Sequence, residues 1–245
     1  MLKCDFHIHT SDDPVDYIEH STYGLIDRAA ALGLGALAIT LHDRQLDEEC
    51  LRDYARDRGI VLLPGVERTI AGKHVVLVNF PAEAERVGSF EELRALKARS
   101  NGLVIAPHPF FPGASCLRSL MDAHADVFDA VEWSYFWTAG VNFNAAARRW
   151  ARDRGKPLVG NSDLHHIRQL GRTCSWVAAE ADPAAICEAV RAGHVSVQTE
   201  PVPLPELAHV FGGMVWRGRK PTEQLGLASG RVQPAIAGAI PSITD

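Results

Sequence analysis

Short apolar segments alternate with amphipathic segments along residues 2–198, and this alternation constrains the fold more than any other feature of the chain. Short apolar runs beside turn residues predict strands, and apolar residues three and four apart predict helices. We expect strands at residues 2–8, 36–40, 60–66, 74–80, 103–106, 130–133, 157–160 and 174–178, with 60–66 and 74–80 as a hairpin. We expect helices at residues 22–32, 47–58, 90–99, 142–154 and from 182 to about 192. This alternation favours a mainly parallel α/β sheet, in which functional side chains gather at the carboxyl ends of strands.

Length and composition set the size of this unit. The chain has 245 residues, of which 47% are hydrophobic and 22% are charged, so it is an ordinary globular sequence and not a disordered or coiled-coil one. We expect one domain over residues 1–199. Residues 200–245 are rich in Pro and Gly and predict a tail that packs on the domain, through the apolar stretch 207–215, or extends from it.

Charge and hydrophobicity exclude several classes of partner. The net charge is −5 and the basic residues form no run, so a long nucleic acid is not expected as a partner. No apolar run approaches the length of a membrane span, and residues 1–7 contain no apolar signal core. The five cysteines include no CxxC pair, which favours reduced, buried thiols. We therefore expect a cytoplasmic protein with no membrane partner.

The segment Asp5-Phe6-His7-Ile8-His9 is the first candidate metal site. In a regular strand alternate residues share a face, so Asp5, His7 and His9 would point the same way. Two imidazoles at this spacing can bind one ion, and Asp5 can orient one of the rings. On its own, the segment is better explained as polar residues at the end of a strand.

Other histidines and acids also follow predicted strands: His42, Glu67, His108, Glu132, Asp163 and His165. Each one alone is explained by a solvated loop or a turn. Together they are imidazoles and carboxylates, the ligand types that suit Zn, Mn, Fe, Co or Ni. They outnumber the ligands that one ion needs, so the sequence predicts two or three ions at one rim of the sheet.

These motifs, in this order along the chain, resemble the PHP family, the polymerase and histidinol phosphatase superfamily. They are Asp5-Phe6-His7-Ile8-His9-Thr10, Ser11-Asp12, Thr40-Leu41-His42, Gly65-Val66-Glu67, Pro107-His108-Pro109 and Asn161-Ser162-Asp163-Leu164-His165. The resemblance covers residues 2–198. It implies a distorted (β/α)7 TIM-like barrel that holds two or three divalent ions (Zn, Mn or Fe) at the C-terminal rim of its strands.

The resemblance also implies which residues bind the ions. The expected ligands are His7, His9 and Asp163 for the first ion, His108 for the second, Glu67 as a bridge between them, and Asp12, His42 and His165 for a third. Glu132 lies where the family has a further ligand of variable type. The family usually has Thr-Asp-His where this chain has Thr40-Leu41-His42. Leu41 cannot accept a hydrogen bond, so either Asp43 orients His42 from the other side or the third site is weaker.

Four further residues are candidates for contact with the substrate: His74, Arg44, Arg168 and Arg172. His74 begins the predicted strand after Glu67, where packing explains it as well as a substrate contact does. An arginine fork suits a phosphate group, although a solvated arginine on a loop explains each of the three positions equally.

The resemblance and the donor set together predict a metal-dependent phosphoesterase that hydrolyses a small phosphomonoester. Clustered ions bind phosphate oxygens, activate water and stabilise the leaving oxygen. The expected catalytic residues are Glu67, Asp163 and His165, and the expected nucleophile is a hydroxide that bridges the ions. The alternatives are an amidohydrolase-like hydrolase of a C–N or ester bond and a non-catalytic PHP scaffold module. Metal content and a panel of phosphate and amide substrates separate the three.

Overall fold

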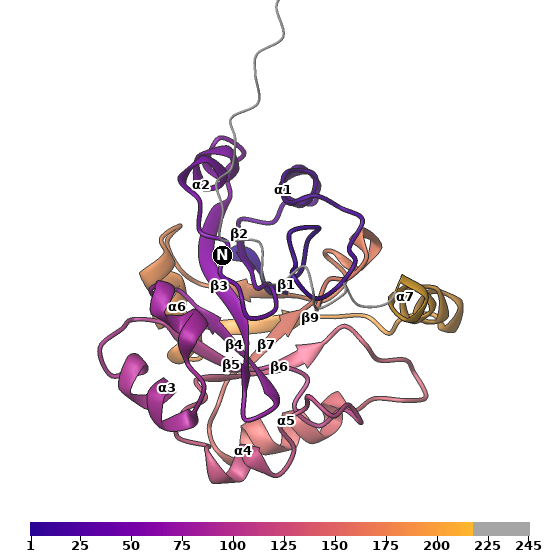
Figure 1. Cartoon of the computed structure of the whole chain (residues 1–245). Coiled ribbons are helices and arrows are strands. Elements are labelled where there is room, and N and C mark those ends of the chain that lie inside the picture. The colour runs from indigo at the N-terminus through magenta and orange to yellow at the C-terminus, as the bar shows by residue number, and fades with distance from the viewer. Residues whose placement is uncertain (218–245) are drawn as a thin grey trace, which may run out of the picture.

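The apolar segments form nine strands in the computed structural model, which describes residues 1–217. The strands are β1 (Leu2–Ile8), β2 (Ala36–Ile39), β3 (Val61–Ile70), β4 (Lys73–Val78), β5 (Leu103–Ala106), β6 (Ala130–Ser134), β7 (Leu158–Asn161), β8 (Cys174–Val177) and β9 (Val195–Gln198). They form one sheet in the order β7-β6-β5-β4-β3-β2-β1-β8-β9, curled into a nearly closed barrel (Figure 1). The predicted α/β barrel is confirmed.

The strand directions explain why there are nine strands and not seven. β1–β2, β2–β3, β5–β6 and β6–β7 pair in parallel, as expected for β/α units. β3 and β4 form the predicted antiparallel hairpin, and β4 also pairs antiparallel with β5. β8 and β9 add a second antiparallel pair beside β1. The barrel is therefore a parallel framework with two antiparallel insertions.

Between β7 and the strands β8 and β1, where the sheet has no backbone pairing, side-chain hydrogen bonds close the barrel. The Ser175 hydroxyl on β8 accepts a hydrogen bond from the Gly160 N–H on β7 (2.9 Å) and donates one to the Gly160 carbonyl (3.1 Å). Asn161 on β7 accepts the backbone N–H of Phe6 on β1 (3.0 Å). A Cβ at Gly160 would lie 2.6 Å from the Cys174 carbonyl oxygen, so only glycine permits this approach. We refer to these contacts as the closing seam.

Helices cover the outside of the strands (Figure 1). They are α1 (Thr22–Ala31), α2 (Glu49–Arg56), α3 (Phe90–Lys97), α4 (Leu120–Ala123), α5 (Asn144–Asp153), α6 (Pro183–Arg191) and α7 (Leu204–Arg217), with 3-10 turns η1 (Ala82–Arg86) and η2 (Ile167–Gln169). Local sequence fixes where they begin. Ser89 and Glu92 form the predicted capping box of α3, and Asp182 caps α6 before Pro183.

The core has an inner and an outer part. Phe6, Leu63 and Ile105 belong to a buried cluster built mainly from strand residues. Ile8 and Ile39, by contrast, share a cluster with Leu25 of α1. Fully burying one such side chain stabilises the fold by about 1.5–3 kcal/mol. The strands therefore hold the site on a rigid frame.

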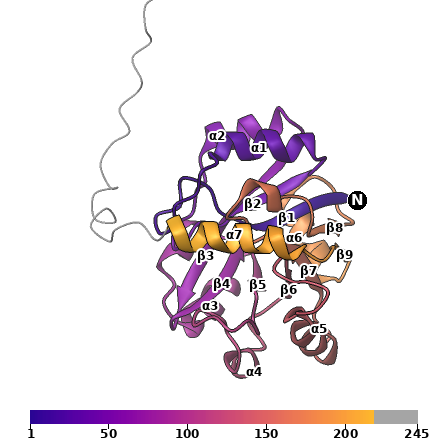
Figure 2. The same ribbon diagram turned by 90° about the vertical axis from the view of Figure 1, so that its right-hand side faces the viewer.

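The segment after β9 contains a helix. α7 lies beside the barrel and crosses in front of its strands in Figure 2. Val202 and Val210 are buried against Tyr135 and Phe136, and Leu207 packs on the same cluster. Residues 218–245 of the predicted tail lie outside the described residues, and the predicted boundary at residue 199 remains a prediction. Among residues 1–217, every helix is too short or too polar to cross a bilayer.

The cysteines are free, as expected. Cys4, Cys116, Cys174 and Cys187 are buried. Cys50 is exposed, because it lies on the solvent side of α2, so burial was wrongly predicted for this one thiol.

Candidate metal centre

The polar residues that follow the strands meet at one end of the barrel. His7 lies near the end of β1 and His9 just after it, Glu67 lies on β3, and His108 and Asp163 follow β5 and β7. The side chains of His7 and His9 are fully buried and that of Glu67 is 1% exposed. Burying so many ionisable groups is costly unless they are paired or bind an ion.

Glu67 is the centre of this cluster. Its two carboxylate oxygens lie 2.7–3.5 Å from ring nitrogens of five histidines: His7, His9, His42, His74 and His108. One oxygen, Oε1, faces His7 (3.3 Å) and His108 (3.5 Å), whereas Oε2 faces His9 (3.4 Å). One carboxylate thus reaches imidazoles from both halves of the barrel, as a bridging ligand must.

Asp163 closes the cluster from β7. Its Oδ1 lies 3.5 Å from His7 Nε2, 3.7 Å from His9 Nε2 and 3.4 Å from His165 Nδ1. Gln169 holds this turn, since its Nε2 donates to the Asp163 carbonyl (3.1 Å) and its Oε1 accepts the His165 N–H (2.9 Å). Asp163 and His108 both have positive φ, +46° and +29°, a backbone strain that is concentrated at functional sites.

His7 on β1 and His9 just after it are oriented as metal ligands are. His7 Nδ1 lies 2.8 Å from Glu132, and His9 Nδ1 lies 2.9 Å from Asp13. The opposite nitrogens, His7 Nε2 and His9 Nε2, are buried and have no hydrogen-bond partner. A carboxylate on one ring nitrogen that leaves the other free is the usual arrangement of a metal-binding histidine. The donor set therefore fits divalent ions, with groups of three donors around His7, His9 and Glu67 and around His7, His108 and Asp163.

Charge coupling inside the cluster is strong. Burial alone lowers the pKa of His7, but Asp163 and Glu67 outweigh it, so the pKa lies well above the ordinary value. Burial likewise opposes the positive charge on His42, yet Glu67 and Asp13 raise its pKa to about 9. Burial raises the pKa of Asp163, and His7 and His165 more than reverse this, to about 2. Protons on imidazoles compensate the carboxylates here, and cations would do the same.

The third group of donors differs from the expected one. The exposed Asp12 accepts hydrogen bonds from Thr22 (2.7 Å) and Thr10 (3.5 Å), outside the cluster. Asp16 Oδ2 lies 3.2 Å from His165 Nε2 and 4.0 Å from His42 Nδ1. The structure thus places Asp16, and not Asp12, beside His42 and His165.

Asp13 replaces the carboxylate that the Thr40-Leu41-His42 motif lacks. Its Oδ2 lies 3.0 Å from His42 Nδ1 and accepts the His42 backbone N–H at 3.0 Å. Asp43 does not compensate, because its carboxylate pairs with Arg68 and the Thr69 backbone N–H. Leu41 is fully buried in the apolar cluster around α1.

Two further acids have positioning contacts. Glu132, expected as a ligand, binds His7 Nδ1 and accepts the His108 backbone N–H (3.2 Å). Asp5, expected to orient a ring, instead accepts the backbone N–H groups of His7 (3.3 Å) and Ser162 (3.2 Å). The β1–β2 register shifts between Asp5 and Ile8, which interrupts the alternation that the prediction assumed.

Of the four candidate substrate contacts, only His74 contacts the cluster, with Nδ1 2.7 Å from Glu67. Arg172 pairs with Glu206 of α7 (2.9 Å). Arg44 is exposed and donates to the Asp12 carbonyl (3.4 Å). Arg168 is exposed on η2. The structure therefore does not bring these arginines together around one anion.

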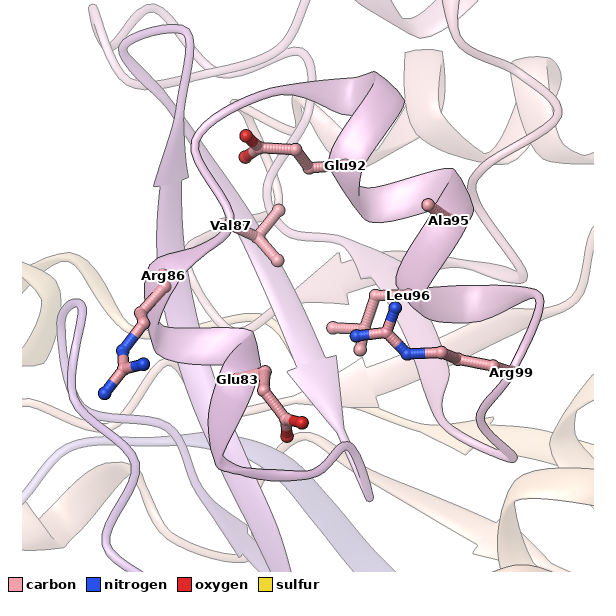
Figure 3. Close-up of a pocket in the computed structure, with 7 residues that line it drawn as sticks. All are labelled: Glu83, Arg86, Val87, Glu92, Ala95, Leu96 and Arg99. Carbon is pink, nitrogen blue, oxygen red and sulfur yellow. The ribbon is translucent and has the colours of Figure 1, made fainter.

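Two pockets have different relations to the cluster. A pocket of about 500 Å³ reaches His108 and Asp163 and is otherwise mostly apolar. A second pocket of about 300 Å³ lies between η1 and α3, lined by charges of both signs (Figure 3). Glu92 in that pocket is engaged in capping α3, and none of its lining residues belongs to the metal cluster.

Comparisons with known proteins concern the family of one segment and the fold. A model of the PHP-associated family matches residues 141–195. No curated protein sequence matches the chain significantly. Among solved structures, a two-domain protein from Bacteroides vulgatus that contains a predicted PHP-like metal-dependent phosphoesterase has a TM-score of 0.63 and 20% identity, covering 87% of this chain and 69% of that one.

Other similar structures have different activities. An amidohydrolase from Chromobacterium violaceum has a TM-score of 0.54 and 16% identity, covering 84% of this chain and 96% of that one. The lesion-specific endonuclease of Pyrococcus furiosus also has a TM-score of 0.54 and 16% identity, covering 96% of this chain and 73% of that one. At these identities the likeness concerns the fold, which hosts several hydrolytic reactions.

The chain thus contains a segment that matches the PHP-associated family, within a fold that it shares with PHP-like proteins. The donor clusters at the barrel rim have the ligand types that suit divalent ions. The reaction and the substrate have to be argued from the site itself.

Proposed function

We propose that this chain is a phosphoesterase that uses divalent ions to hydrolyse a small phosphomonoester. The observation that carries the proposal is the pair of buried, unpartnered nitrogens, His7 Nε2 and His9 Nε2, directed at the carboxylates of Glu67 and Asp163. A scaffold module has no need to bury two such nitrogens, because a buried polar atom without a partner destabilises the fold.

The residues of the cluster have three different roles: to bind ions, to orient the histidine rings and to donate a proton. His7, His9, Asp163 and His108 would hold two ions with Glu67 between them, and His42, His165 and Asp16 would hold a third. Bound divalent ions supply Lewis acidity toward the phosphoryl oxygens and lower the pKa of water. Asp13 and Glu132 fix the rings through their Nδ1 atoms. Where the third ion is absent, His165 is the candidate proton donor to the leaving oxygen, because Asp16 lies 3.2 Å from its Nε2 and would stabilise a proton there.

A phosphomonoester is favoured over a long nucleic acid by charge. The net charge of the chain is −5, and its arginines near the site are paired or exposed. A protein that tracks a nucleic-acid backbone needs a row of cations, which neutralises successive phosphates.

The test is metal-dependent turnover by the full chain. Protein purified without chelator should contain at least two divalent ions by elemental analysis, and stripping them should abolish phosphomonoester hydrolysis, with Mn or Zn restoring it. The same preparation should leave amides and carboxylic esters intact. Full turnover by stripped protein, or a preference for amides, would refute the proposal, and an ion-free, inactive preparation would indicate a scaffold.

A further inference from the structure

The apolar pocket of about 500 Å³ begins at the metal cluster, where His108 and Asp163 form its inner end. Its wall is largely aromatic, with Phe111, Phe136, Trp137, Phe143 and Phe211 as the main side chains. The volume lies in the range of sites for small molecules, which are mostly apolar with a few polar groups at one point.

The aromatic rings lead from the cluster toward solvent. The Phe111 ring centre lies 6.4 Å from that of His108 and 5.2 Å from that of Phe143. On the other side, Phe136 of the barrel and Phe211 of α7 are 5.0 Å apart. These distances match those of interacting aromatic pairs, so the rings form a pre-arranged apolar wall.

Three of the seven exposed large hydrophobic side chains of the described residues line this pocket. Phe143 is 40% exposed, Phe211 is 45% exposed and Val141 is 54% exposed, and all three line it. Apolar side chains that gather at an opening in this way usually mark a binding site. A bound apolar group would cover these side chains and gain the hydrophobic energy that they now lack.

Beyond His108 and the ion-binding residues at its inner end, the pocket offers a ligand no positive charge. No lysine or arginine is among its lining residues in the described part of the chain. The neighbouring Arg118 donates to the Phe111 carbonyl (3.1 Å), and Arg172 pairs with Glu206. A second anionic group on a substrate would therefore lose water here without gaining a partner.

We propose that this pocket binds an uncharged aromatic group on the alcohol side of the phosphoester, which makes phosphomonoesters of aromatic alcohols the preferred substrate class. This inference rests on the proposed function for the reaction, but the pocket's affinity for an aromatic group does not. The phosphoryl group lies at the ions, and the aromatic group extends along Phe111 toward Phe143.

The first experiment compares 2-phenylethyl phosphate with ethyl phosphate. Both lose an alkoxide of similar basicity, so the ratio of their kcat/KM values reports binding of the ring and not leaving-group chemistry. The full chain with metal restored should prefer 2-phenylethyl phosphate by about tenfold or more, the discrimination typical of an apolar pocket. Equal values for the two esters would overturn the inference.

Alanine variants of aromatic residues with similar exposure show whether the preference for the ring comes from this pocket. Phe143→Ala should bring the ratio close to one, and Phe211→Ala provides a second variant on a different element. Tyr23→Ala is the control, because Tyr23 is 44% exposed on α1 and does not line the pocket. A ratio that stays unchanged in both phenylalanine variants would overturn the assignment to this pocket.

A binding measurement separates this inference from the proposed function. 2-Phenylethanol should bind the metal-stripped full chain in calorimetric titration, and Phe143→Ala should weaken that binding about tenfold. Binding without hydrolysis of any phosphoester would refute the phosphoesterase and retain the pocket. Hydrolysis of phosphoesters without 2-phenylethanol binding and without a preference for the ring would retain the phosphoesterase and refute the pocket. If Phe143→Ala instead dissociates an oligomer and binding is absent, the face covers a second copy and the inference is wrong.

Discussion

The metal cluster and the aromatic pocket meet at His108 and Asp163, yet they are built in opposite ways. The cluster is buried, charged and held by side-chain hydrogen bonds, with ligands that come from the ends of the strands. The pocket is half-exposed and uncharged over most of its wall, and it uses the segment after β5, the β6–α5 connection and α7. We infer that, in the proposed phosphoesterase, the rigid barrel would hold the reacting groups, whereas the loops and α7 would set the choice of substrate.

Removing the central carboxylate should affect the cluster most and leave the pocket intact. Glu67→Gln removes the charge that faces five imidazoles, so two ions should be lost. Because such ions contribute several kcal/mol to the transition state, turnover should fall about a thousandfold or more. Elemental analysis and kinetics measure this, while 2-phenylethanol binding serves as the control. Near-normal metal content and turnover would show that the reaction centre lies elsewhere.

A carboxylate introduced at the buried position of Leu41, next to His42, should lower the stability of the fold and should not increase metal binding. Leu41→Asp restores the usual family residue, but Leu41 is fully buried and Asp13 already orients His42. The free energy of unfolding should fall by more than about 3 kcal/mol in denaturant titration, because the new carboxylate has no partner. Leu41→Met is the control and should cost less than about 1.5 kcal/mol. Wild-type stability with increased metal content would contradict this account.

The loop between β1 and α1 offers a matched pair of substitutions. Asp16→Asn should lower the affinity for a third ion about tenfold or more, because Asp16 contacts His165. Asp12→Asn should leave ion affinity unchanged, since Asp12 accepts a hydrogen bond from the Thr22 hydroxyl, outside the cluster. Isothermal titration with Mn or Zn compares the two variants. The reverse ranking would restore Asp12 as the ligand.

The pH dependence should also distinguish the two regions. In metal-stripped protein the pKa of His42 is raised to about 9, so its contribution to stability is full below about pH 6.5 and is lost as pH rises through 9. Between pH 7 and 8.5 the free energy of unfolding should fall by about 1 kcal/mol per pH unit for such a histidine. Metal-loaded protein should show no such fall, and 2-phenylethanol binding should stay constant. A flat profile in stripped protein would contradict the coupling.

Most of the frame was predictable because its signals are local. The hairpin of β3 and β4, the cap of α3 and the start of α6 follow from short motifs. β9 was not predicted, although Val195-Ser196-Val197-Gln198 alternates apolar and polar residues as an edge strand does. α4 has only four residues, too few to give a periodic pattern.

The site was predictable at the strand ends and less so in the loops. His7, His9, Glu67, His108 and Asp163 converge because parallel strands end at one rim. The choice among the acids in Asp12-Asp13-Pro14-Val15-Asp16 depends on a turn in which Asp13 accepts the N–H groups of Val15 and Asp16, and spacing alone does not reveal it. The shift at Asp5 arises from the register between two strands, which is set by contacts distant in sequence.

The closing seam has a consequence for synthesis of the chain. Phe6 and Asn161, which it joins, are 155 residues apart, so this contact forms late in folding. His7 and His9 leave the ribosome long before Asp163, and until the ring closes they lack the carboxylate of Asp163. An ion that binds all of them favours the closed ring over every partly folded state by mass action. Supply of the metal during translation should therefore govern the yield of folded protein as well as its activity.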